Sequence, residues 1–119
     1  MIDIHCHLLP GIDDGPSNWD ESLELCRAMA SDGIKRAVAT PHLIEGVWDN
    51  LRSRVEPLTA ELTTRLAAAG IALEVISGGE VDISSHLIAE ASAELPAIGG
   101  KALLLEMPVA VVPAAMAET

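Results

Sequence analysis

The chain opens with MIDIHCHLLPGIDDGP, residues 1–16, in which a short β-like segment leads into a loop rich in glycine, proline and aspartate. Branched aliphatic residues predict a strand over Ile2–His7. His5 and His7 are two positions apart, so their side chains should leave the same face of that strand. The side chains expected on the opposite face, packed under helices, are those of Ile2, Ile4 and Cys6.

Similar β-like runs recur along the chain, and segments with helical periodicity lie between them. The four runs are Ile2–His7, Ile34–Thr40, Ala72–Ser77 and Ala102–Glu106. Strands and helices that alternate in this way predict an α/β fold of about four βα units with parallel strands.

The first helix is expected to begin after Ser17 or Asn18. Either residue could cap it, and Asn18 with Glu21 has the spacing of a capping box. Gly33 is a suitable stop. The apolar side chains of this first helix fall on one face at helical spacing: Trp19, Leu23, Cys26, Met29 and Ala30.

A second helix is expected over residues 49–69, with Gly70 as its stop. Pro57 lies inside it, as either a kink or a second start. Its apolar stripe comprises Leu51, Val55, Leu58, Leu62 and Leu66. The remaining predictions are a third helix from Ser84 or Ser85 to a point before Pro96, a turn at Gly99-Gly100, and the first turn of a further helix over Pro113–Thr119.

Composition limits the classes of function. The 119 residues are enough for one domain, and seven basic against eighteen acidic residues give a net charge of −11. Such a charge excludes binding of nucleic acid through a broad basic face and argues against an anionic membrane surface. Two cysteines are too few for a disulfide scaffold. The chain has neither a signal peptide nor an apolar run of about 20 residues, so we expect a soluble, cytoplasmic protein without membrane insertion.

Histidines and carboxylates stand at the end of each expected strand. They are His5 and His7, then His42, Glu80 and Glu106, and the loop after the first strand adds Asp13 and Asp14. In parallel α/β sheets the carboxyl ends of the strands build the site. One such residue alone is most often a surface residue or a satisfied core partner, but all four strands share the pattern. A metal site is therefore expected.

The donor types narrow the choice of metal. Imidazoles and carboxylates without a cysteine ligand favour Mn²⁺, Fe²⁺ or Zn²⁺. Cys6 points away from the histidine pair and Cys26 belongs to the helix stripe, so both are expected to be buried and apolar in character. Several carboxylates near several histidines suggest more than one ion, and clustered ions suit displacement at phosphorus.

Two other phosphate chemistries are excluded. A cysteine-dependent phosphatase needs an arginine six positions after its cysteine, but Ile12 follows Cys6 and Asp32 follows Cys26 at that distance. No Gly-x-x-x-x-Gly-Lys-Ser/Thr phosphate-binding loop is present either.

Five sequence blocks resemble the PHP-domain (polymerase and histidinol phosphatase) protein-tyrosine phosphatases of the CpsB/CapC type, from bacterial capsule and exopolysaccharide operons. The blocks are residues 1–7, 9–16, 39–42, 78–80 and 103–108. A His-x-His pair alone is common to many metal-dependent hydrolases, whereas the Leu-Pro-Gly-Ile-Asp-Asp-Gly loop is far more specific. The resemblance implies that residues 1–119 are the N-terminal half of a TIM-like (β/α)7 PHP barrel, with an incomplete set of ligands for catalysis.

The same resemblance implies a multinuclear manganese centre, with Fe²⁺ or Zn²⁺ as alternatives. His5 and His7 would hold one ion, and Glu80 would bridge it to a second that Glu106 also binds. Asp14 and His42 would hold a third, while Asp13 would orient the loop.

The implied activity is hydrolysis of phosphotyrosine in a protein, with a bacterial tyrosine kinase as the expected partner. Two alternatives remain open. One is a PHP phosphoesterase acting on a small phosphomonoester such as histidinol phosphate. The other is a non-catalytic, metal-stabilised interaction module, because half a barrel leaves an open sheet edge that a partner or a second copy could cover.

Overall fold

The computed structural model describes residues 1–90, 92–99 and 101–106. The expected Gly99-Gly100 turn falls partly outside these residues, and the expected helical turn over Pro113–Thr119 falls entirely outside them. In chain order the elements are β1 (Ile2–Cys6), α1 (Trp19–Ser31), β2 (Arg36–Ala39), β3 (His42–Ile44), β4 (Trp48–Asp49), α2 (Arg52–Ala69), β5 (Glu74–Ser77), β6 (Glu80–Asp82), α3 (His86–Ala89) and β7 (Leu104–Glu106).

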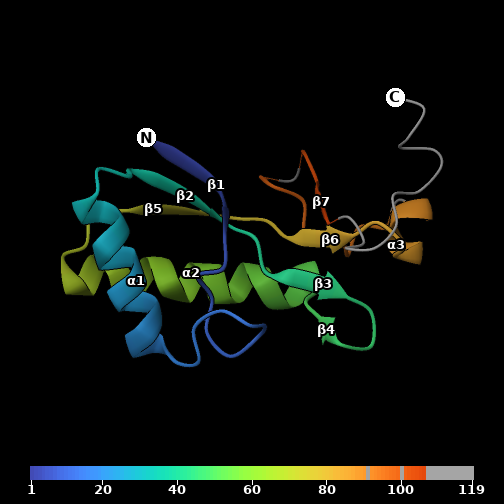
Figure 1. Cartoon of the computed structure of the whole chain (residues 1–119), viewed down its shortest axis with the longest axis horizontal. Coiled ribbons are helices and arrows are strands. Elements are labelled where there is room, and N and C mark those ends of the chain that lie inside the picture. Colours follow the sequence, from blue (N-terminus) through green and yellow to red (C-terminus); the bar gives the residue numbers. More distant parts are fainter. Residues whose placement is uncertain (91, 100, 107–119) are drawn as a thin grey trace.

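The strands form two sheets that lie end to end (Figure 1). The first has the order β1-β2-β5, with both pairings parallel. The second has the order β4-β3-β6-β7, in which β3, β6 and β7 are parallel and β4 is antiparallel to β3. The α/β class with parallel strands is confirmed, but the fourth predicted strand, β7, pairs with β6 in the second sheet and not with β5.

Two backbone interruptions divide the strands between the sheets. Thr40-Pro41 separates β2 from β3, and proline has no N–H with which to continue a ladder. Gly78-Gly79 separates β5 from β6. A Cβ on Gly79 would lie 2.3 Å from Cγ of Pro96, so only glycine fits there. The second sheet consequently starts with His42 paired to Glu80.

An irregular pairing in β1 changes which face its side chains occupy. Asp3 pairs with Ala37 and Cys6 with Ala39, so three steps along β1 match two along β2. This bulge puts Asp3 and Cys6 on one side of the sheet. The expectation that Ile2 and Ile4 pack under helices beside Cys6 is wrong for this reason: Cys6 is buried, whereas Ile2 is 57% and Ile4 is 62% exposed.

The two long helices cover the same side of the first sheet (Figure 1). Asn18 caps α1 by accepting a hydrogen bond from the Glu21 amide, and a left-handed Gly70 ends α2. Pro57 lies within one continuous α2, so it does not begin a second helix. The core that α1 and α2 share with the sheet includes the first predicted helix stripe, from Trp19 to Ala30, and the second from Val55 to Leu66. Leu51, also predicted in the second stripe, is the N-cap of α2 and packs against a separate buried cluster with Leu43 and Val81. No helix among the described residues is both long and apolar enough to cross a membrane.

Candidate metal centre

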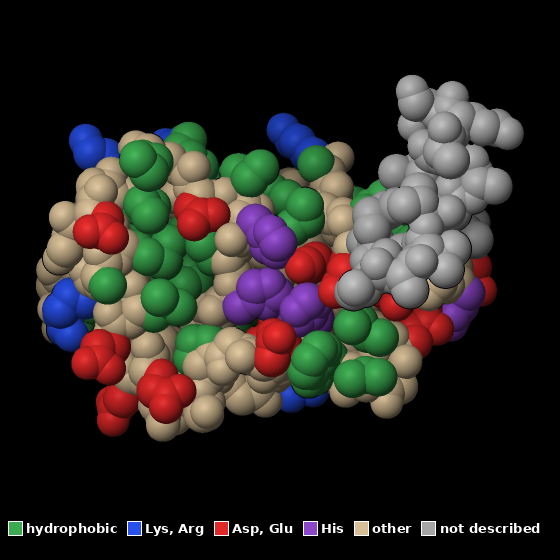
Figure 2. Space-filling model, in the orientation of Figure 1, with side chains coloured by type: hydrophobic (Ala, Val, Ile, Leu, Met, Phe, Trp, Pro, Cys, Tyr) green, Lys and Arg blue, Asp and Glu red, His purple; other side chains and the backbone are tan. Residues whose placement is uncertain are grey.

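Histidine and acidic side chains gather midway along the molecule, where the two sheets meet (Figure 2). The carboxyl end of β1 and the first residues of β3 and β6 converge at this junction. All six predicted ligands lie here, in three overlapping groups whose nitrogen and oxygen atoms are within 4.8 Å of one another. The groups are His5, His7 and Glu80; His42, Glu80 and Glu106; and His7, Asp14 and His42.

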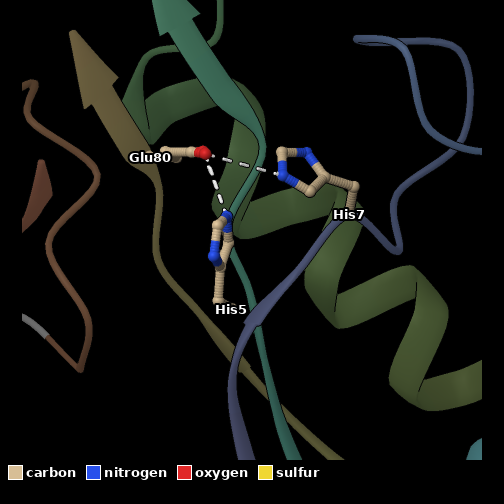
Figure 3. A group of neighbouring side chains, drawn as sticks. All are labelled: His5, His7 and Glu80. Atoms are coloured by element: carbon tan, nitrogen blue, oxygen red, sulfur yellow. Dashed lines mark hydrogen bonds and ion pairs between the residues drawn. The ribbon is translucent and has the colours of Figure 1, made fainter. Parts of the chain in front are cut away.

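The first group joins β1 to β6 (Figure 3). Nε2 of His5 lies 2.9 and 3.1 Å from the two carboxylate oxygens of Glu80. Nε2 of His7 lies 3.8 Å from Oε1 of Glu80. Both imidazoles therefore point at the carboxylate of Glu80. This residue begins β6 and is only 6% exposed.

Glu80 and His42 extend the cluster into the second sheet. Nδ1 of His42 lies 3.0 Å from Oε2 of Glu106 and 3.7 Å from Oε2 of Glu80. Nε2 of the same ring lies 3.4 Å from Oδ1 of Asp14, whose side chain is exposed. The ring of His7 stands 4.4 Å from that of His42, centroid to centroid. Both nitrogens of His42 consequently face carboxylates from different segments.

Asp13 belongs to none of the three groups, but it bonds to two candidate ligands, His7 and His42, and to Gly15 in its own loop. Its Oδ2 lies 2.9 Å from Nδ1 of His7 and accepts the backbone N–H of His42 at 3.0 Å. The hydrogen bond to Asp13 raises the pKa of His7. Burial alone would raise the pKa of Asp13, but its hydrogen bonds with His7, Gly15 and His42 hold that pKa below its usual value. Asp13 thus fixes His7 and the start of β3 relative to each other.

Two residues that the sequence patterns did not single out support His42. The fully buried Asn50 donates from Nδ2 to the carbonyl oxygens of Ile12 at 2.7 Å and His42 at 2.8 Å. The indole of Trp48 stacks on the His42 imidazole. The one sequence feature that could have drawn attention to them is an aromatic residue and an asparagine close before the second helix.

Other features of the described chain lie outside this centre. Cys6 and Cys26 are both buried in the core under the first sheet, as expected. A cavity of about 350 Å³ lies elsewhere, and its lining, which includes Arg52, Ile88 and Lys101, contains none of the candidate ligands.

A parallel α/β fold with clustered imidazoles and carboxylates at the ends of its strands is typical of metal-dependent hydrolases. The family model for capsular polysaccharide synthesis, CpsB/CapC, matches residues 1–108. The chain belongs to this family.

Named relatives agree with that assignment. The chain is similar to tyrosine-protein phosphatase YwqE of Bacillus subtilis (strain 168), with 42% identity over 83 residues that cover 70% of this chain and 33% of YwqE. It is 32% identical to the putative tyrosine-protein phosphatase CapC of Staphylococcus aureus over 88 residues, 74% of this chain and 34% of CapC.

A solved structure has the same fold. It comes from work on YwqE of Bacillus subtilis and CpsB of Streptococcus pneumoniae, described there as unique metal-dependent tyrosine phosphatases. The match has a TM-score of 0.90 at 36% identity and covers 99% of this chain and 49% of that one. The chain therefore spans about half of the solved structure and about a third of the curated relatives.

Proposed function

We propose that residues 1–119 supply the N-terminal half of a PHP-type (β/α)7 barrel that hydrolyses phosphotyrosine in proteins with the aid of bound metal ions. The observation that carries this proposal is the set of three overlapping histidine–carboxylate groups at the junction of the two sheets. Membership of the CpsB/CapC family and the partial coverage of its longer members support the assignment to half a barrel.

The charges of the cluster fit bound cations. Among the described residues, the ion-pair partners of Asp13, Asp14, Glu80 and Glu106 are histidines, with no lysine or arginine within 4.0 Å. Crowded carboxylates repel one another unless positive charge is shared among them. Nitrogen and oxygen donors without sulfur suit Mn²⁺, with Fe²⁺ or Zn²⁺ as alternatives.

Each ligand has a defined place in the proposed centre. His5, His7 and Glu80 would hold one ion, and Glu80 would also contribute, with Glu106, to a second. Asp14 and His42 would hold a third, with a ring nitrogen of His7 close to both. When bound, such ions stabilise the charge on phosphoryl oxygens and lower the pKa of water to near neutrality.

The protein's own contribution is to orient these donors. Because Nδ1 of His7 is hydrogen-bonded to Asp13, the ring keeps Nε2 as the lone-pair nitrogen that faces Glu80. The phenol oxygen of tyrosine, with a pKa of about 10, is a good leaving group compared with an alkyl alcohol. A centre that binds phosphate through cations would also allow a chain of net charge −11 to accept an anionic substrate.

The test combines metal uptake with turnover. We expect the purified chain to bind Mn²⁺ by elemental analysis and Glu80→Gln to lose ions from two of the groups. Glu74→Gln is the matched control, because Glu74 is an exposed carboxylate on β5 whose partner is Arg36. Absence of metal from the parent chain would contradict the proposed centre.

Turnover then separates the candidate reactions. A phosphotyrosine peptide and histidinol phosphate are compared at equal Mn²⁺, with released phosphate as the readout, in this chain and in a version extended to the length of its relatives. We expect preference for the phosphotyrosine peptide. Faster hydrolysis of histidinol phosphate would favour the small-molecule phosphoesterase, and metal binding without any turnover in the extended chain would favour an interaction module.

A further inference from the structure

Trp48 makes a ring contact with a proposed metal ligand. Its indole and the imidazole of His42 are stacked, with centroids 5.1 Å apart and planes inclined by 21°. The antiparallel pairing of β3 with β4 places Trp48 opposite Ile44, which lies two residues beyond His42 on the same face of β3. Trp48 and His42 are therefore diagonal neighbours across the hairpin, a distance that an aromatic side chain can span.

The orientation of the His42 ring decides which carboxylate each of its nitrogens meets. Nδ1 faces Glu106 at 3.0 Å, whereas Nε2 faces Asp14 at 3.4 Å. Rotation of the ring about its Cβ–Cγ bond would remove both contacts together. The backbone of His42 is held by Asp13 and Asn50, but neither of these bonds restrains the ring itself.

We propose that Trp48 is a positioning residue of the candidate metal centre: its indole packs against one face of the His42 imidazole and fixes the ring angle at which the two nitrogens point to different carboxylates. This inference rests on the proposed function only in that His42 serves as a metal ligand. It adds a residue that touches no ion and sets the geometry of one that does. Outer-shell residues that orient a ligand through a hydrogen bond typically change metal affinity by about 10–100-fold when they are replaced, and we expect a stacked ring to act at the lower end of this range.

The stacking itself is tested without metal. In the parent chain, NMR should give upfield-shifted ring protons for His42, because they lie over the indole. We expect Trp48→Leu to remove this shift and Trp48→Phe to retain a smaller one. Val47→Ala is the matched control, since Val47 is an exposed neighbour on the same hairpin and should leave the His42 signals unchanged.

Mn²⁺ titration by calorimetry tests the consequence. We expect Trp48→Leu to weaken binding by about tenfold or more, Trp48→Phe to stay within about threefold of the parent, and Val47→Ala to match it. Rescue by phenylalanine separates ring stacking from simple filling of space. Far-UV circular dichroism of each variant confirms that the comparison is made between folded chains.

Two results would overturn the proposal: identical His42 ring shifts in the parent and in Trp48→Leu, or parent-like Mn²⁺ affinity in Trp48→Leu. A parent chain that binds no Mn²⁺ would overturn it together with the metal centre. A parent that binds Mn²⁺ but hydrolyses no phosphotyrosine in its extended form would count against the proposed function alone, since the affinity comparison would still stand.

Discussion

Asn50, like Asp13, ties the loop after β1 to the start of β3. Its amide nitrogen donates to the carbonyl oxygens of Ile12 and His42, which come from segments 30 residues apart (42 − 12 = 30), and it is fully buried. A buried carbonyl that loses its donor keeps its cost of desolvation. The position of His42 thus depends on a residue outside the three candidate ligand groups.

Replacement of Asn50 by alanine should lower the free energy of unfolding by about 2–4 kcal/mol, because the buried carbonyl of Ile12 and the part-buried carbonyl of His42 lose their hydrogen-bond donor. Urea denaturation in the absence of metal measures this change. Glu61→Gln, an exposed substitution on α2, is the control and should stay within about 0.5 kcal/mol. A loss for Asn50→Ala no larger than that of the control would contradict the proposed link.

The candidate ligands were easier to predict from the sequence than Trp48 and Asn50, the residues that hold His42 in place. His5, His7 and His42 stood out because every expected strand led to a histidine or carboxylate, and because a pair of imidazoles on one strand face is costly to bury without a partner. Trp48 and Asn50 did not, because β4 has two residues and leaves no periodic pattern to detect. Their roles depend on tertiary contacts alone.

At the scale of elements, the site depends on where strands are interrupted. The helices were predictable from caps and apolar stripes, which act locally. The interruptions at Pro41 and Gly78-Gly79 were not recognised as strand junctions, because β3 and β6 have three residues each, and proline and glycine were equally consistent with simple strand ends. The second and third expected strands, which had been expected to lead directly to His42 and Glu80, in fact resume with these residues in the second sheet.

Gly79→Ala should destabilise the chain by about 1–3 kcal/mol or more, because the added methyl group would lie 2.3 Å from Cγ of Pro96 and one of the two backbones would have to move. Thermal unfolding measures this effect. Gly46→Ala is the reference: nothing lies within 4 Å of its Cβ, but its φ of +80° costs an alanine about 1 kcal/mol. Equal losses for the two variants would show that the contact with Pro96 is easily relieved.

At the scale of the whole molecule, the two cysteines report on the integrity of the core. Burial raises the pKa of Cys26 to about 11 and, together with the neighbouring Asp3, that of Cys6 to about 12. Both thiols should therefore react very slowly with Ellman's reagent at pH 8 in the folded chain and rapidly in denaturant. Fast labelling of the native chain would mean that the core opens readily.

The raised pKa values of the two thiols make the free energy of unfolding depend on pH. An unfolded thiol has a pKa of about 8.5, so above that pH the unfolded chain releases protons that the folded chain retains. The stabilising contribution is complete below this pH and is lost as the pH rises toward 11, the value for Cys26. Urea denaturation between pH 8 and pH 10 should show a falling free energy of unfolding, and Cys26→Ala should flatten the slope.

Bound ions should couple distant parts of the chain. The candidate ligands come from residues 5 to 106, and an unfolded chain cannot hold them together. A ligand at about 100 times its dissociation constant stabilises the folded state by about 2.7 kcal/mol. Mn²⁺ should therefore raise the unfolding midpoint of the parent and of Glu74→Gln by the same amount. Addition of a chelator should return both midpoints to their metal-free values. An equal rise in Glu80→Gln would place the binding elsewhere.

The extra residue between Asp3 and Cys6 makes the length of the first strand as important as its composition. Deleting Ile4 would let β1 align with β2 residue for residue, with Asp3 still paired to Ala37 and Cys6 to Ala39, so both would keep the side of the sheet that they now share. The surplus residue therefore decides which upstream positions face the core: in an unbulged strand of the same sequence, Asp3 would lie on the opposite side from Cys6.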